Sequence, residues 1–333
     1  MKISDVGEFK LIEMIEARAG LPSYPVVVGI GDDAAVLDVG PRTQVVTTTD
    51  MLVEGVHFGR ETTPPRDLGY KSLAVNLSDL AAMGASPVQS FLSMGLTPDT
   101  RLADLEAFVD GFLEAGKGIT LAGGDTVSSP SGWVISVTVM GLSPSGKVLR
   151  RDMAKAGERL WLCGPVGDAA GGLSILLGET KAGTPEDSDF LVRRHNRPEP
   201  MVRMGKILLE TGFSACAIDV SDGLLQDLGH ICRKSRVGAE IETEKLPLGR
   251  QLLDLADANG KDPLDWALAG GEDYSLLFTV PPEKEEKLAA LVQREELDAV
   301  SIGRIVPVTG IRVTRDGEPV EREGKQGWDH FSR

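Results

Sequence analysis

The chain contains the stretch Leu73-Ala74-Val75-Asn76-Leu77-Ser78-Asp79-Leu80-Ala81-Ala82. Apolar side chains would cover most of the circumference of a helix with this sequence, so we predict a long helix over residues 67–83. Lys71, Val75 and Asp79 fall on one stripe of that helix. Such a stripe is usually an exposed Lys–Asp face. Because the rest of the helix is apolar, we expect Asp79 to be partly buried and to need a partner.

Strands and helices alternate on both sides of this helix. In the first half we expect a helix at 4–18, strands at 26–30, 34–38, 44–49, 88–96, 119–122 and 133–142, and a helix at 101–117. In the second half we expect strands at 159–163, 215–220, 237–242, 274–280, 300–305 and 311–314, and helices at 168–178, 187–194, 199–211, 222–235 and 283–295. This mixture predicts two α+β domains, over residues 1–148 and 149–333.

The charge of the chain restricts its partners. Its 333 residues include 50 acidic and 35 basic ones, which gives a formal net charge of -15. Binding to nucleic acid needs a basic surface, so nucleic acid is not an expected partner. A nucleotide is compatible with this charge if metal ions lie between the acidic side chains and the phosphates.

The cysteines and the apolar runs bear on location. Cys163, Cys216 and Cys232 lie in or next to apolar stretches and form no C-x-x-C pair, so we expect them to be reduced and structural. No signal peptide and no bilayer-spanning run is visible. We therefore expect a cytoplasmic protein that does not insert into a membrane.

Short acidic motifs flanked by Gly, Ser or Thr recur along the chain. They are Gly29–Asp33, Thr47–Asp50, Ser78–Asp79, Gly123–Thr126, Asp219–Gly223 and Gly270–Asp273. Several carboxylates that converge at strand ends would repel one another, and divalent cations would relieve that cost. Carboxylate oxygens are the ligands that Mg²⁺ prefers, and glycines let the backbone approach phosphates. The motifs therefore indicate metal-assisted phosphate chemistry.

Each motif taken alone also has a structural explanation. Gly29–Asp33 fits a hairpin turn, and Gly123–Thr126 fits a tight turn about as well as a phosphate loop. Ser221 or Asp222 could cap the helix that follows them. Asp219, at the end of an apolar strand, has no such explanation.

Taken in order, the motifs resemble the thiamine-monophosphate kinase family. The matching segments are Gly29–Ala35, Thr48–Phe58, Tyr70–Ala85, Gly123–Thr126, Ile218–Leu224, Gly270–Tyr274 and Trp328–Phe331. The resemblance implies the two-domain fold of the aminoimidazole ribonucleotide synthetase superfamily. It also implies a homodimer whose N-terminal domains pair into a β-barrel. ATP and several Mg²⁺ ions are expected in a cleft between the domains, where the γ-phosphoryl group passes in line to thiamine monophosphate. The product is thiamine diphosphate, and this is the last step of its biosynthesis.

The resemblance also assigns roles to residues. The implied metal ligands are Asp33, Thr48, Thr49, Asp50, Asp79, Asp125, Asp219 and Asp222. The implied ATP contacts are Gly124, Asp125, Arg151 and Ser221, with Arg150 as an alternative to Arg151. The implied contacts to thiamine monophosphate are His57, Glu272 and Trp328. A flat cationic thiazolium suits the face of Trp328, although an aromatic residue near the terminus can equally anchor the chain.

No catalytic base is expected, because the acceptor is a phosphate oxygen that is already largely ionised near neutral pH. Two other classes compete with a kinase: a ligase-type relative such as aminoimidazole ribonucleotide synthetase, and a nucleotide sensor without catalysis. The ligase has no clear use for Trp328–Phe331, and a sensor would not need every carboxylate.

Overall fold

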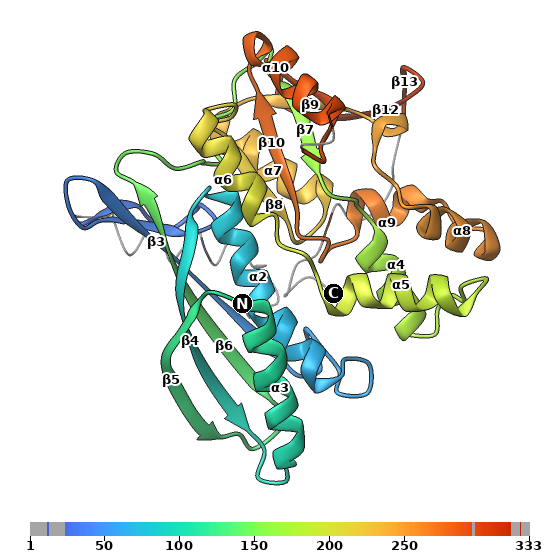
Figure 1. Ribbon diagram of the computed structural model, residues 1–333. Helices are drawn as coiled ribbons and strands as arrows, with labels where there is room; N and C mark the ends of the chain where they lie inside the picture. The colour runs from blue at the N-terminus through green and yellow to red at the C-terminus, as the bar shows by residue number, and fades with distance from the viewer. Residues whose placement is uncertain (1–11, 13–23, 295–296, 321–326, 328–333) are drawn as a thin grey trace, which may run out of the picture.

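The computed structural model describes residue 12 and residues 24–294, 297–320 and 327. The helix expected at 4–18 lies outside the described residues except for Ile12, and so does Trp328. The chain folds into two α+β domains, each built on one mixed sheet (Figure 1). This confirms the fold class predicted from the sequence.

The first sheet has six strands in the order β1-β2-β3-β6-β4-β5. They are β1 (Val26–Val28), β2 (Ala35–Asp38), β3 (Thr43–Val53), β4 (Ser86–Leu96), β5 (Thr120–Ser128) and β6 (Val134–Pro144). Only the β4–β5 pair is parallel within the strands described. Two helices, α2 (Pro65–Ala82) and α3 (Leu102–Ala115), cover one face of this sheet (Figure 1).

The second sheet has seven strands in the order β13-β12-β9-β11-β7-β10-β8. They are β7 (Arg159–Cys163), β8 (Ala217–Val220), β9 (Gly238–Glu242), β10 (Ser275–Val280), β11 (Val300–Val306), β12 (Gly310–Arg315) and β13 (Glu318–Pro319). The helices around it are α4 (Asp168–Leu176), α5 (Pro185–Asn196), α6 (Val202–Thr211), α7 (Leu224–Ser235), α8 (Arg250–Asn259), α9 (Pro263–Ala269) and α10 (Pro282–Gln293), with a short 3₁₀ helix, η2, at Thr243–Lys245.

Helix α2 joins the two domains. It packs on α3, β3 and β6 of the first domain and also on α6, β8 and β10 of the second (Figure 1). A Cβ atom at Gly69 of α2 would lie 1.9 Å from the Phe108 carbonyl oxygen of α3, and one at Gly205 of α6 would lie 2.0 Å from the Ala81 carbonyl oxygen of α2. Both helix crossings therefore depend on glycine.

The described residues form four hydrophobic clusters, and one of them draws on both domains. Val36, Leu73 and Trp133 belong to the core of the first domain. Ala82 and Leu149, by contrast, pack in one cluster with residues of the second sheet. Leu149 follows the predicted boundary at residue 148 and packs with the second domain. Ala82 precedes that boundary but packs with the second domain as well.

Several predicted boundaries were wrong. Helix α2 begins at Pro65 rather than residue 67, since Pro fits the first helical turn. Strand β3 continues to Val53, so Asp50 lies inside a strand and not at its end. Strand β5 continues through Gly123, Gly124 and Asp125, which the sequence predicted to follow a strand. The helices α8 and α9 were not predicted.

Other expectations are confirmed. All three cysteines are free and buried, as expected for structural thiols. Within the described part of the chain, no helix is both long and apolar enough to span a bilayer. The predicted β-barrel between two copies is not tested by a single chain.

Candidate active site

Three carboxylates from distant parts of the chain converge between the domains. Asp33 lies before β2, Asp79 lies near the end of α2, and Asp219 lies on β8. One oxygen from each can be chosen so that all lie within 4.8 Å of one another. Oxygens bound to one Mg²⁺ are separated by roughly 3–4 Å, so small side-chain adjustments would let these three hold a cation.

Strand β3 adds two side chains to this group from one face. Thr48 is buried and donates a hydrogen bond of 2.5 Å from its hydroxyl to Asp79 Oδ2. Asp50 lies two residues further along on the same face, because side chains alternate along a strand. Thr49 points to the other face, where its hydroxyl donates to the Val137 carbonyl at 3.1 Å. The structure therefore brings Thr48 and Asp50 to the carboxylates, but not the Thr49 side chain.

The carboxylates of this group raise one another's pKa. Burial raises the pKa of Asp79 well above its usual value, and the negative charges of Asp50, Asp219 and Asp33 raise it further. Burial followed by the charge of Asp33 likewise raises the pKa of Asp219. Burial and Asp222 raise the pKa of Asp50 to about 6. Asp222 thus adds to the negative charge that acts on Asp50.

Arg151 is a cation that pairs with one of these carboxylates. Its guanidinium forms a fork with Asp33, with Nε 2.7 Å from Oδ2 and a terminal nitrogen 2.5 Å from Oδ1. Its pKa is raised because Asp33, Asp32 and Asp219 outweigh its burial. Arg150 instead pairs with Asp152 at the surface, 2.7 Å apart. The geometry therefore favours Arg151 over Arg150 as the arginine of the site.

Asp32 has a supporting role. It accepts the Asp33 amide at 3.0 Å and the Arg151 amide at 3.4 Å. Burial and the neighbouring Asp33 raise its pKa to about 7. Asp32 therefore organises the turn on which Asp33 sits.

A buried acid that the sequence analysis did not single out, Asp227, shapes the loop after β8. Its Oδ2 atom accepts the amides of Ser221, Asp222 and Gly223, each at 3.1 Å. Asp227 lies in the first turn of α7, five residues after Asp222. An acidic residue in a first helical turn is common enough that the pattern alone does not identify it as a loop-holding group.

The structure does not bring Asp125 to the three carboxylates. It is exposed on β5, where its Oδ1 accepts the neighbouring Thr126 amide at 2.8 Å. Gly124 has φ of +155°, and a Cβ atom there would lie 1.7 Å from the Leu92 carbonyl oxygen. Close packing of β5 on β4 therefore explains this glycine without a ligand, and the metal and ATP roles of Gly124 and Asp125 stay predictions.

Two of the three predicted substrate contacts, His57 and Glu272, are among the described residues. His57 accepts the Val53 amide at Nδ1, 3.0 Å away, in the turn after β3. Glu272 precedes β10, and His57 is among the positive groups that lower its pKa. Gly327, next to the undescribed Trp328, lies against the Gln226 side chain, which donates to Asp222 Oδ2 at 3.1 Å.

Next to Glu272, Asp273 has a structural role. Its two oxygens accept the amides of Gly167 and Ala169 at 2.7 and 3.1 Å, which fixes the start of α4.

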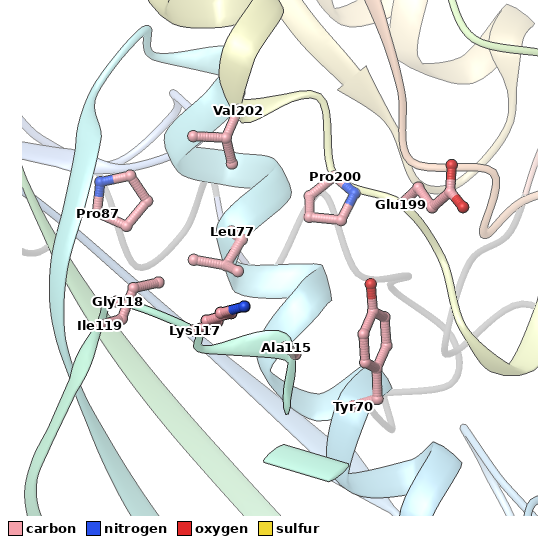
Figure 2. A pocket seen from close by; sticks show the side chains of 10 residues that line it. All are labelled: Tyr70, Leu77, Pro87, Ala115, Lys117, Gly118, Ile119, Glu199, Pro200 and Val202. Atoms are coloured by element: carbon pink, nitrogen blue, oxygen red, sulfur yellow. The ribbon is translucent and has the colours of Figure 1, made fainter. Parts of the chain in front are cut away.

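A hollow of about 510 Å³ lies elsewhere, between α2, α3 and residues 199–202 (Figure 2). Tyr70 and Leu77 line it, and both are on the side of α2 roughly opposite Asp79. Figure 2 shows Lys117 and Glu199 among the side chains that line it, with no member of the carboxylate group. This hollow is therefore separate from the site of the carboxylates.

The fold and the carboxylate site together define a class of protein. Residues 31–143 match the family model described as "AIR synthase related protein, N-terminal domain", and residues 155–316 match the corresponding C-terminal domain. The chain belongs to this family and, within it, to the thiamine-monophosphate kinases. It is 40% identical over 330 residues to the thiamine-monophosphate kinase of Escherichia coli (strain K12), covering 98% of both chains.

Two solved structures of relatives agree with this placement. The chain is similar to the thiamine-monophosphate kinase of Stenotrophomonas maltophilia K279a, with 42% identity, a TM-score of 0.76 and coverage of 93% of this chain and 96% of the other. It is also similar to "AaThiL complexed with AMPPCP and TMP", with 34% identity, a TM-score of 0.86 and coverage of 99% of each chain.

Proposed function

We propose that the chain transfers the γ-phosphoryl group of ATP directly to thiamine monophosphate, giving thiamine diphosphate and ADP. The observation that carries this proposal is the group Asp33, Asp79 and Asp219, whose oxygens lie within 4.8 Å of one another. The relative described as bound to AMPPCP and TMP supports the choice of ligands, because it covers 99% of this chain.

The acidic and basic residues of the site would have different roles. Asp33, Asp50, Asp79, Asp219 and Asp222 would hold Mg²⁺, with the Thr48 hydroxyl at their edge. When bound, Mg²⁺ would neutralise charge on the phosphates and keep the donor and acceptor groups together. Arg151 supplies a positive charge beside Asp33, and Asp227 holds the amides of the Ser221 loop in place. A phosphate acceptor needs no base, so positioning and charge neutralisation suffice.

The remaining assignments are part of the same proposal. Thr49 and Asp125 would add further metal ligands, and ATP would contact Gly124, Asp125, Arg151 and Ser221. Thiamine monophosphate would contact His57, Glu272 and Trp328. The free, buried cysteines support a cytoplasmic location.

A homodimer also belongs to this proposal. Large apolar side chains are exposed on the first sheet, including Met51 on β3 and Val127 on β5, each 57% exposed. Strand β5 is an edge strand that is exposed along its length. A second copy would cover this surface.

The test is a coupled assay for ADP release by the purified chain. Release should require both thiamine monophosphate and Mg²⁺, and mass spectrometry should find thiamine diphosphate. A formyl-amidine substrate that supports turnover in place of thiamine monophosphate would favour the ligase alternative. ATP binding without any turnover would favour the sensor.

A further inference from the structure

An ion cluster surrounds Glu272 and draws on both domains. Lys71 on α2 places its Nζ atom 3.0 Å from Glu272 Oε1. His195 on α5 places Nδ1 3.1 Å from Glu272 Oε2. The side chains of Lys71 and His195 are 1% and 5% exposed, whereas that of Glu272 is 27% exposed. Each carboxylate oxygen therefore contacts one buried side chain, and the carboxylate is still partly exposed to solvent.

Lys71 has no other evident reason to be buried. Its Nζ forms no hydrogen bond of good geometry within the described residues, so its contact with Glu272 is an ion pair. A buried ammonium is costly unless it is paired with an opposite charge. The pairing with Glu272 thus accounts for a buried lysine on α2.

The backbone of Glu272 is fixed as firmly as its side chain. Glu272 has φ of +67° and Tyr274 has φ of +52°, both in the left-handed region. The Glu272 amide donates to the Ser221 carbonyl at 2.7 Å, and the Tyr274 amide donates to the Val220 carbonyl at 2.8 Å. Residues other than glycine keep such a conformation only where their surroundings enforce it. The loop therefore presents the carboxylate in one orientation.

The charges around Glu272 favour its ionised form. Burial alone would raise its pKa, but nearby groups, above all the Lys71 ammonium, lower it below the usual value. Burial and Lys71 lower the pKa of His195 to about 4, so His195 is uncharged near pH 7 and Lys71 supplies the positive charge of the cluster. An ionised carboxylate only accepts hydrogen bonds, and it has more lone pairs than Lys71 and His195 use.

We propose that Lys71 and His195 are positioning residues that fix Glu272 as an ionised acceptor for an N–H donor of the substrate. This inference rests on the proposed function, in which Glu272 contacts thiamine monophosphate. The neutral N–H donor of that molecule is the amino group on its pyrimidine ring. The cluster would then select ligands that carry this amino group and would have no part in holding ATP.

The test measures the Kd of thiamine monophosphate by calorimetry, with Mg²⁺ and a non-hydrolysable ATP analogue present. K71M should raise this Kd by about tenfold or more, because Glu272 would lose the group that holds it in place. A tenfold change corresponds to the loss of the charge-assisted hydrogen bond between Glu272 and the substrate. The Kd of the ATP analogue should not change. K71R should restore part of the affinity, and Lys206→Met, an exposed lysine on α6, is the matched control.

A double variant separates positioning from general damage. If Lys71 acts through Glu272, K71M combined with E272Q should bind no more weakly than E272Q alone. An analogue without the pyrimidine amino group should bind wild type weakly, and K71M should no longer distinguish it from thiamine monophosphate. Two results would overturn the proposal. One is a double variant whose rise in Kd is the product of the rises for the single variants, and the other is an unchanged Kd for K71M.

Thermal melts establish whether K71M folds. If it does not, K71Q and H195A take its place, each with and without E272Q, and an unchanged Kd for both overturns the proposal. A wild-type chain that binds thiamine monophosphate but releases no ADP disproves the kinase activity, while the Kd series still tests the positioning. A wild-type chain that does not bind it disproves both.

Discussion

Asp79 shares its surroundings with three other carboxylates, Asp33, Asp50 and Asp219. Without a cation, each carboxylate raises the cost of ionising the others. This repulsion opposes folding, and the proposed binding of Mg²⁺ would relieve it.

This conflict predicts opposite effects of Asp79→Asn on stability and activity. The amide removes one charge but keeps an oxygen that can accept from Thr48. Without Mg²⁺ the free energy of unfolding of the variant should exceed that of wild type by roughly 1–3 kcal/mol, so the variant should melt at a higher temperature. It should gain less stability from added Mg²⁺. Turnover should fall by more than about a hundredfold, beyond the cost of a supporting residue. Melts with and without Mg²⁺ check this, and a lower melting temperature without metal would contradict it.

Asp273 gives the pH prediction. Burial, with Asp168 nearby, raises its pKa to about 7, from 3.8 in the unfolded chain. Between these values the folded state holds the proton more tightly, so the contribution of Asp273 to stability falls as pH rises from about 4 to 7. Asp273→Asn should remove this part of the pH dependence. Urea denaturation at pH 5 and pH 8 measures it, with Asp265→Asn as an acid on α9 for comparison. If the free energy of unfolding changes equally between pH 5 and pH 8 in wild type and Asp273→Asn, Asp273 is not the source of the pH dependence.

The sequence could predict the aspartates better than their partners. Asp33, Asp79 and Asp219 each stand in a short motif next to an apolar run, and the structure brings them together. Lys71 lies on the same helical stripe as Asp79, but the usual explanation for such a stripe was an exposed face. Its burial depends on Glu272, about two hundred residues further along the chain, and no local pattern encodes that contact.

At the scale of single elements, the loop between β8 and α7 is held by one side chain. Asp227 accepts three of its amides, at Ser221, Asp222 and Gly223. Removing the acceptor leaves these amides without their partner, which costs about 1–3 kcal/mol for each buried group left unpaired.

Asp227→Ala should therefore reduce both stability and turnover, whereas Asp227→Asn should reduce them less because one oxygen remains. The KM for ATP should rise with the alanine variant, since Ser221 and Asp222 lie in this loop. Asp254→Ala, an exposed acid on α8, is the control. Equal effects of the alanine and asparagine variants would show that the charge matters and the accepted amides do not.

Strand lengths show where local patterns mislead. The run Thr47–Asp50 was expected to end its strand, yet β3 continues for three more residues because β6 pairs with it up to Val53. In the same way β5 continues through two glycines because β4 supplies its partners. Pairing between distant strands overrides the weak strand propensity of Gly and Asp.

The crossing of α6 and α2 provides a test of packing. Alanine usually stabilises a helix relative to glycine. At Gly205, however, a Cβ atom would lie 2.0 Å from the Ala81 carbonyl oxygen, so Gly205→Ala should destabilise the chain by about 1–3 kcal/mol. Gly183→Ala, where no atom lies within 4 Å, should have little effect. Urea denaturation compares the two, and an equally stable Gly205→Ala would mean that the helices separate readily.

At the scale of the whole molecule, the exposed apolar face of the first sheet predicts self-association. Sedimentation velocity should show a dimer, and Val127→Glu should shift it toward monomer by placing a charge on edge strand β5. Circular dichroism of the variant should match wild type, because Val127 is 57% exposed in the single chain. A monomeric wild type at micromolar concentration would contradict the predicted homodimer.

Helix α2 gives the molecule one more property. Its Gly69 faces α3, its Ala81 faces α6, and its Ala82 packs in a core that belongs to the second sheet. Because α2 packs tightly against both domains, a rotation of either domain would move Asp79 and Lys71 with it. Heat or denaturant should therefore melt both halves together in one transition. A chain cut after residue 148 should yield two fragments that regain structure only when mixed.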